Sequence, residues 1–238
     1  MTVDTVFLLD VDNTLLDGDS IVSDMHAHFI SEFGISAAQR YWDIFDQLRI
    51  ELGYVDYLGA LQRFRLEVDQ GSIEERRLLT VSSFFIDFPF ADRLYPRALE
   101  VIEYLGRFGQ TVLLTDGDVV LQPHKLQRSG LWDAVEGRAL VYVHKEQSLH
   151  AVEFRYPARQ YVMVDDKLRI LAAMKTIWRE RLTTVFVRQG HYAQDPAQLA
   201  AQPDADVTVE RIGELADLSV SHLLGLPIQK PHITPETL

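Results

Sequence analysis

Short apolar runs recur near the start of the chain and throughout its second half, and polar or small residues flank each of them. Runs that are apolar throughout, rather than alternating, are typical of strands buried on both faces of a parallel sheet. We therefore predict parallel strands at Val6–Leu9, Thr111–Leu114, Ala139–Val143, Tyr161–Val164, Leu182–Val187 and Val207–Val209.

The segments between these runs carry apolar residues at helical spacing. Pro96 suits the first turn of a helix that runs through Phe108 and ends at Gly109. Alternation of strands with helices predicts an α/β fold, a Rossmann-like parallel sheet with helices on both faces. Further helices are expected at Pro123–Arg128, Lys167–Arg179 and Ile212–Leu218.

A long helical segment interrupts this alternation after the first strand. Its aromatic and leucine residues are best interpreted as its own core and packing face. We predict a core domain of residues 1–18 and 91–238 and an inserted helical domain of residues 19–90. The tail Leu226–Leu238 is expected to be irregular. Helical patterns cover Ile21–Phe33, Ala37–Leu52, Tyr54–Val68 and Ile73–Phe85, with breaks at Gly34, Gly53 and Gly71.

Composition indicates an ordinary globular protein. Hydrophobic residues make up 47% of the chain, and no apolar segment approaches the roughly 20 residues that cross a bilayer. A net charge of −12 without a basic run argues against nucleic acid or anionic lipid as a partner. The sequence has no cysteine and no signal-peptide pattern, so a cytoplasmic location is expected.

Two carboxylates, Asp10 and Asp12, follow the first predicted strand directly. Ligands of open α/β sheets bind just beyond the carboxyl ends of the strands. One carboxylate there can attack phosphorus, and the other can exchange a proton with the leaving group and then with water. A divalent cation such as Mg²⁺ would offset the charge of the carboxylates and of a phosphate.

Two other interpretations of this motif were weighed. A calcium-binding loop would need an acid and a glycine where Thr14 and Leu15 stand, and a glutamate where Ile21 stands. That pattern is absent. The pair Asp12 and Asn13 could also be simple turn chemistry after a strand, and the motif alone does not exclude it.

A second acid pair, Asp165 and Asp166, follows the run Tyr161–Val164. These carboxylates could complete the oxygen shell of an ion bound by Asp10 and by the backbone carbonyl of Asp12. The alternative is an N-cap for the following helix, which one aspartate could supply but which leaves the second unexplained.

A third strand, Thr111–Leu114, leads into Thr115, Asp116 and Gly117. The Thr115 hydroxyl can donate to a phosphate oxygen, and Gly117 allows backbone N–H groups to approach it. An ordinary strand-to-turn transition explains the same residues. Among the five lysines, Lys145 follows a predicted strand and is the preferred phosphate ligand, with Lys125 as the second candidate.

The order of these motifs resembles the haloacid dehalogenase superfamily of hydrolases. It comprises the D-x-D-x-T pattern at residues 10–14, the strand ending in Thr115, then Lys145, then the pair Asp165 and Asp166. The helical insert resembles the first-position cap domain of that family. The resemblance spans nearly the whole chain.

The resemblance implies a role for each motif. Asp10 becomes the nucleophile that forms an aspartyl-phosphate and Asp12 the general acid and base, with its carbonyl on Mg²⁺. Thr115 and Lys145 become phosphate ligands. Asp166 aligns with the direct metal ligand and Asp165 with a residue beside it. The dehalogenases of the superfamily lack an acid at position 12, so a phosphatase acting on a small phosphorylated metabolite is expected.

Four features depart from the family pattern. Asp116 stands where Asn is common, Asp118 adds an acid, Glu146 replaces a frequent Pro, and Asp165 replaces a common Gly. Two alternative functions stay open: a phosphomutase, which passes the phosphoryl group to a sugar, and a binding or regulatory protein with weak turnover. The sequence sets neither the substrate, nor the cap residues that select it, nor the oligomeric state.

Overall fold

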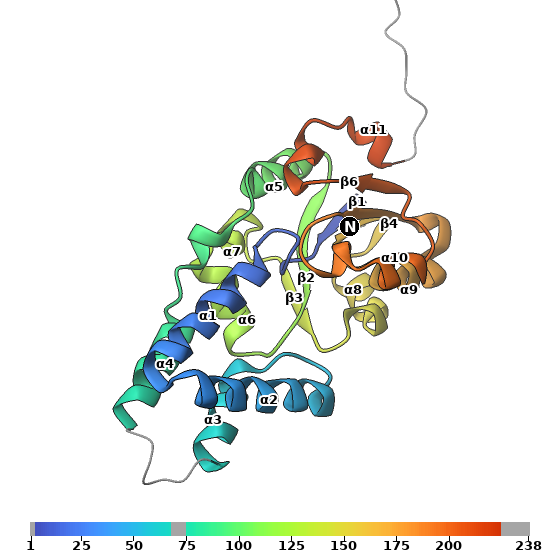
Figure 1. The fold of residues 1–238 in the computed structure, drawn as a ribbon. Helices are drawn as coiled ribbons and strands as arrows, with labels where there is room; N and C mark the ends of the chain where they lie inside the picture. Colours follow the sequence, from blue (N-terminus) through green and yellow to red (C-terminus); the bar gives the residue numbers. More distant parts are fainter. Residues whose placement is uncertain (1–2, 68–74, 225–238) are drawn as a thin grey trace, which may run out of the picture.

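The computed structural model describes residues 3–67 and 75–224. Its core is one sheet of six strands in the order β3-β2-β1-β4-β5-β6, and every pairing is parallel (Figure 1). The predicted α/β, Rossmann-like fold is confirmed. The strands are β1 (Val3–Leu9), β2 (Gln110–Asp116), β3 (Ala139–Tyr142), β4 (Ala158–Asp165), β5 (Leu182–Val187) and β6 (Val207–Val209).

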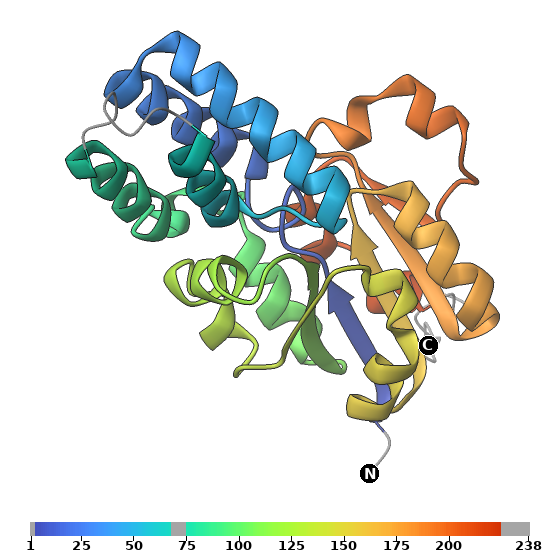
Figure 2. The same cartoon turned by 90° about the horizontal axis from the view of Figure 1, so that it is seen from below.

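Both faces of the central strand are covered, which explains its unbroken apolar run. Alternate residues of a strand point to opposite faces. Phe7 and Leu9 belong to one hydrophobic cluster, whereas Val6 and Leu8 belong to another. Helices α5 (Ala98–Gly106), α7 (Leu131–Ala134) and α11 (Val220–Leu223) contribute to the first cluster, and α8 (Leu149–Arg155) and α9 (Leu168–Trp178) to the second (Figure 2).

The register of the sheet brings three strand ends together. Leu9 is paired with Leu113 on one side and with Val164 on the other. The N–H of Asp10 then donates to the carbonyl of Val164 over 3.0 Å. The chain runs from β1 to β2 and β3 on one side, and then crosses to β4 on the other side of β1. This change of direction makes the end of β1 the switch point of the sheet, where ligands of such folds bind.

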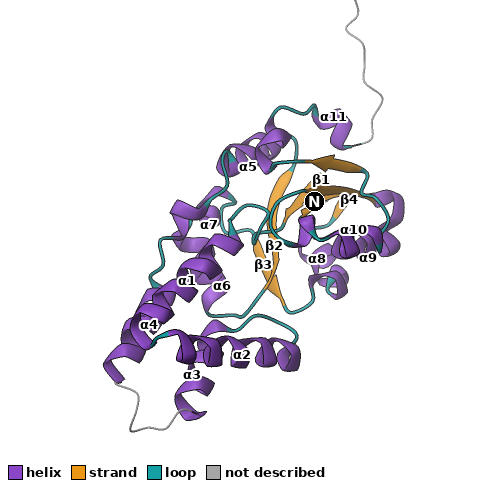
Figure 3. Cartoon of the chain, viewed as in Figure 1, coloured by secondary structure: helices purple, strands orange, loops and turns teal. Residues whose placement is uncertain are grey.

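Four helices between β1 and β2 form a group that lies beside the sheet and contains no strand among its described residues (Figures 1 and 3). Phe29, Tyr41 and Phe64 form its aromatic centre, with 4.5 Å between the ring centroids of Phe29 and Tyr41. The predicted ends Val68 and Ile73 and the predicted break at Gly71 lie outside the described residues. The helices are α1 (Gly18–Phe33), α2 (Ile35–Leu52), α3 (Tyr57–Glu67) and α4 (Glu75–Ile86).

Two chain segments run side by side where this helical group joins the sheet. The N–H of Asp17 donates to the carbonyl of Arg93, and the N–H of Tyr95 donates to the carbonyl of Leu15. Leu16 and Leu94 form an isolated antiparallel bridge between the same segments. The predicted domain boundaries at residues 18–19 and 90–91 fall beside this junction.

The helices predicted at Pro96–Phe108 and Lys167–Arg179 are present as α5 and α9, and two other predicted helices differ from the structure. The segment predicted as a helix at Ile212–Leu218 is a short 3-10 helix, η5 (Ile212–Ala216), and the helix predicted from Pro123 begins earlier, as α6 (Leu121–Arg128). The sequence patterns missed α7, α8, α10 (Pro196–Ala200) and α11. The predicted tail lies outside the described residues. Within residues 3–67 and 75–224, no helix is long and apolar enough to span a membrane. Short 3-10 helices also occur at η1 (Phe90–Arg93), η2 (Lys145–Gln147), η3 (Arg179–Arg181) and η4 (Tyr192–Gln194).

Candidate active site

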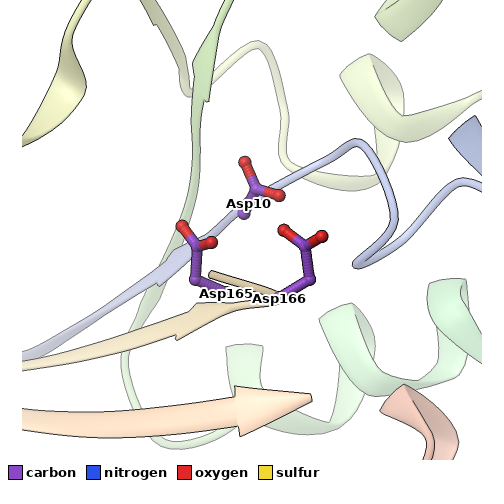
Figure 4. Close-up of side chains that lie close together, drawn as sticks. All are labelled: Asp10, Asp165 and Asp166. Carbon is purple, nitrogen blue, oxygen red and sulfur yellow. The ribbon is translucent and has the colours of Figure 1, made fainter. Parts of the chain in front are cut away.

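Three aspartates from two neighbouring strand ends meet at the switch point. Asp10 follows β1, Asp165 ends β4 and Asp166 follows it, and their side chains gather in one space (Figure 4). One carboxylate oxygen of each lies within 4.8 Å of the others, and all three residues are buried. Three acids this close and this deep repel one another, so the group needs positive charge to be stable.

Asp166 is the member of this group without a partner. Among the described residues, neither of its carboxylate oxygens has a hydrogen-bond donor, although both are buried. Burial, together with the charge of Asp165, raises its pKa well above the ordinary value despite the nearby ammonium of Lys167. A buried carboxylate without a donor is costly, and a hard cation with oxygen ligands would satisfy it.

The ammonium group of Lys145 brings positive charge to the aspartate cluster. Its ammonium is buried, donates to Asp10 Oδ1, and lies 2.7 Å from Asp165 Oδ2. Burial opposes its charged form, but the carboxylates of Asp10, Asp165 and Asp116 hold its pKa above the ordinary value. Lys145 stands in η2, just after β3, so the preferred lysine reaches the site.

The carboxylate of Asp10 is held from two sides. Its Oδ2 accepts a hydrogen bond of 3.0 Å from the hydroxyl of Thr14, opposite the oxygen that Lys145 contacts. The pKa of Asp10 is raised to about 6. Burial and the charge of Asp165 raise this pKa, and together they outweigh Lys145, which lowers it. A bound divalent cation would lower that pKa and favour the ionised form.

Asp12 is bound by two residues of α6. Lys125 Nζ lies 2.7 and 2.9 Å from its two carboxylate oxygens, and the amide of Gln122 donates to Oδ2 over 3.0 Å. Burial opposes ionisation, but Lys125 and Gln122 hold the pKa of Asp12 below its usual value. Lys125 therefore reaches the site as well, on a different aspartate from Lys145. Gln122 was not among the predicted site residues, and its spacing of three from Lys125 on one helix is the signal that was available.

The residues at the end of β2 and just after it brace the site rather than leave donors free. Gln122 donates to the Thr115 hydroxyl over 2.9 Å, so this amide joins Asp12 to Thr115. The Asp116 carboxylate accepts the Lys145 N–H at 2.8 Å, and the Gly117 N–H donates to the Tyr142 carbonyl. Asp118 accepts the N–H groups of the first turn of α6. The substrate-binding roles expected of Thr115, Asp116 and Gly117 stay predictions.

Glu146 stands next to the site lysine and is nearly buried. It accepts a hydrogen bond of 2.8 Å from Arg169 of α9. Burial raises its pKa, but the guanidinium outweighs it and the net shift is downward. This ion pair holds the turn that carries Lys145, a position at which a proline would have stiffened the backbone instead.

The parallel sheet, its switch point and the buried aspartates with their lysine define a hydrolase of the haloacid dehalogenase type. A family model described as haloacid dehalogenase-like hydrolase matches residues 5–177. The structure of a protein named as a haloacid dehalogenase-like hydrolase from Burkholderia xenovorans LB400 is 60% identical, covers 93% of this chain and 99% of that one, and has a TM-score of 0.86. The chain therefore belongs to the haloacid dehalogenase-like hydrolase family.

More distant structures share the fold. The L-2-haloacid dehalogenase from Xanthobacter autotrophicus is 16% identical, with a TM-score of 0.59, and the alignment covers 91% of this chain and 98% of that one. YfnB, a HAD hydrolase of Bacillus subtilis bound to magnesium, is 16% identical over 95% of this chain and 100% of its own, with a TM-score of 0.58. No curated protein matches the chain.

Proposed function

We propose that this hydrolase is a Mg²⁺-dependent phosphatase that acts on a small phosphomonoester through a phosphoryl group carried by Asp10. The observation that carries the proposal is the partnerless, buried carboxylate of Asp166 beside Asp10 and Asp165, the two aspartates with which Lys145 is paired. The acid at position 12 supports phosphoryl transfer over dehalogenation, because an ester leaving group needs a proton and a halide does not.

The oxygen-only donor set fits a hard divalent cation. Asp10 and Asp166 would hold the ion, Asp165 would lie beside it, and the backbone carbonyl of Asp12 would add a further oxygen. When bound, Mg²⁺ supplies charge that offsets the phosphate and the carboxylates. The buried, unsatisfied oxygens of Asp166 are the structural evidence that a cation belongs here.

The chain's own groups account for the chemical steps. A carboxylate oxygen of Asp10 attacks phosphorus, and the bond from phosphorus to the ester oxygen breaks as that oxygen takes a proton from Asp12. Water then attacks the same phosphorus and gives a proton to Asp12, which restores Asp10 and releases phosphate. Lys145 stabilises charge on the transferred group, since its ammonium already contacts Asp10.

Asp12 must be protonated at the first step, although Lys125 holds its pKa low in this arrangement. A phosphate dianion placed beside Asp12 raises that pKa, because a like charge disfavours the carboxylate. Substrate binding would thereby produce the acid only when a leaving group is present to use it.

The helical group of α1–α4 is proposed to act as a cap. The chain enters and leaves this group through the paired segments at Leu15–Asp17 and Arg93–Tyr95, and two paired segments can serve as a hinge. Closure of the cap would exclude water during transfer.

The test is phosphate release from a panel of small phosphomonoesters, with and without Mg²⁺. We expect turnover that is lost in EDTA and lost by at least about a thousandfold in Asp10→Asn, because that variant removes the attacking oxygen. Chloride release from L-2-chloropropionate is the matched alternative reaction. Metal-independent chloride release, without phosphate release, would overturn the proposal.

A further inference from the structure

Lys167 is a cation beside the aspartate cluster to which the proposed steps assign no role. It follows Asp166 directly and precedes the first turn of α9. Lys125 is paired with Asp12, and Lys145 is paired with Asp10 and Asp165. Within the described ranges, Lys167 has neither a hydrogen bond from its ammonium nor a carboxylate at ion-pair distance. Its charge is therefore available to a ligand.

An aromatic ring holds this ammonium in place. Lys167 Nζ lies 4.7 Å from the ring centroid of Tyr192, a cation–π distance. This contact fixes the position of the Lys167 ammonium next to the aspartate cluster.

The loop that carries Tyr192 is fixed to the base of the helical group. The N–H of His191 donates to Asp19 Oδ2 over 2.8 Å, and its Nδ1 lies 2.6 Å from Asp19 Oδ1. Asp19 belongs to the first turn of α1 and is also held by the Asn13 side chain. Tyr192 therefore stands where the sheet domain meets the proposed cap.

A second tyrosine comes to the same region from the helical group. Burial raises the pKa of Tyr57, and the neighbouring charge of Asp12 and the Tyr192 hydroxyl raise it further. Tyr57 begins α3, and Asp12 is the residue expected to protonate the leaving group. Lys167 and Tyr192 therefore lie at the junction of the sheet and the helical group, whereas Lys145 contacts Asp10 itself. A cavity of about 230 Å³ adjoins them, lined by Lys167, Arg169, Phe186, Tyr192, Gln198 and Gln202 among others.

We propose that Lys167, supported by Tyr192, binds a second anionic group, a carboxylate or a second phosphate, on the leaving group of the substrate. The inference rests on the proposed phosphatase function and names its substrate class: phosphomonoesters with an additional negative charge. Lys145 remains the ligand of the transferred phosphoryl group. Lys167 is a specificity-determining residue in this account.

Three substrates with the same three-carbon chain test the inference: propyl phosphate, 3-phosphooxypropanoate and propane-1,3-diyl bisphosphate. The wild-type protein should prefer one or both of the two substrates with a second anion, and which one it prefers distinguishes carboxylate from phosphate. Lys167→Met should lower kcat/KM about 10- to 100-fold on the preferred substrate, mainly through KM, because a charge-assisted contact is lost. On propyl phosphate the loss in the variant should be clearly smaller, because that substrate has no second anion for Lys167 to contact.

Matched variants separate charge from structure. Lys167→Arg should keep most of the preference, and Tyr192→Leu should reduce it while the lysine remains. Lys175→Met is the control on the same helix, since Lys175 pairs with Asp206. Thermal unfolding checks that each variant is folded, and Tyr192→Leu carries the test if Lys167→Met does not fold.

The outcomes distinguish this inference from the function on which it rests. Equal loss on all three substrates in Lys167→Met, or no preference in the wild type, overturns the inference and leaves the phosphatase intact. Absence of Mg²⁺-dependent turnover on every phosphomonoester overturns both. Calorimetric binding of the same three compounds to Asp10→Asn gives a readout without turnover, and the same preference is expected there.

Discussion

Asp12 shows how a single carboxylate depends on residues outside the obvious motif. Its oxygens receive three hydrogen bonds from Lys125 and Gln122, and Gln122 also contacts Thr115. These bonds fix the direction in which Asp12 can deliver a proton. A positioning role for Lys125 follows from this geometry, distinct from the phosphate-binding role considered for it from the sequence.

We predict that Lys125→Met lowers kcat about 10- to 100-fold on alkyl phosphates, because a misaligned acid cannot follow the leaving oxygen. The loss should be much smaller on p-nitrophenyl phosphate, whose leaving group needs little protonation. Steady-state kinetics on both substrates provides the measurement, with Lys175→Met as the control. An equal loss on both would show that Lys125 does not act through Asp12.

The site residues differ in how far the sequence predicted them. Asp10, Asp12, Asp165, Asp166 and Lys145 each follow an apolar strand, and parallel strand ends meet at one edge, so their convergence could be predicted. Gln122 and Lys167 were not predicted. The spacing of Gln122 from Lys125 was an available signal, but the contacts of both residues depend on the rotation and position of a helix. No short pattern encodes those quantities.

At the scale of elements, the loop after β5 closes the site from one side. Gln189 donates to the Thr14 carbonyl over 3.1 Å and accepts the Ile212 N–H at 2.7 Å. Gly190 has a φ of +70°, and a Cβ there would lie 2.5 Å from Asn13 Cβ. The loop that carries Tyr192 therefore packs directly on the loop that carries the first two aspartates.

We predict that Gly190→Ala destabilises the protein by about 1 kcal/mol or more and lowers kcat/KM at least about tenfold, through left-handed strain and displacement of Asn13. Chemical denaturation and kinetics measure the two effects. Gly106→Ala is the matched control, because it lies in α5 and its added Cβ meets nothing within 4 Å. If both variants show the same stability and the same kcat/KM, the packing of Gly190 on Asn13 does not contribute to function.

The helices and strands also differ in how well the sequence predicted them. The four helices of residues 18–86 had helical periodicity and the strands had unbroken apolar runs, and the positions of both were predicted within a few residues. Helices α7, α10 and α11 span only 4, 5 and 4 residues, too short for a periodic pattern. Their ends depend on tertiary packing against the sheet.

For the whole molecule, we expect the buried acids to make stability depend on pH and on a bound cation. The folded pKa of Asp10 is raised from 3.8 to about 6, and that of Asp166 is also raised. In the metal-free protein these two groups bind protons more tightly than in the unfolded chain. The contribution of Asp10 to stability is therefore present at low pH and declines as the pH rises from about 4 through 6, and that of Asp166 also declines as the pH rises.

We predict that Mg²⁺ raises the melting temperature, and by more at pH 7.5 than at pH 5, because the ligands must be deprotonated to bind it. At 100 times the dissociation constant, the stabilisation should be about 2.7 kcal/mol. Differential scanning calorimetry with and without Mg²⁺ measures this. Asp166→Asn should lose most of the effect, and an undiminished shift in that variant would place the ion elsewhere.

The most direct test of the account is to look for the phosphoryl group on Asp10. A reaction with excess phosphomonoester and Mg²⁺ is quenched in acid, and the mass of the proteolytic peptide that contains Asp10 is measured by mass spectrometry. The proposed mechanism predicts that a fraction of that peptide is heavier by the mass of one phosphoryl group. This heavier peptide should be absent in Asp10→Asn and in the presence of EDTA. Rapid turnover in H₂¹⁸O that instead places ¹⁸O in the Asp10 carboxylate would contradict it, because water would then have attacked the aspartyl carbon rather than phosphorus.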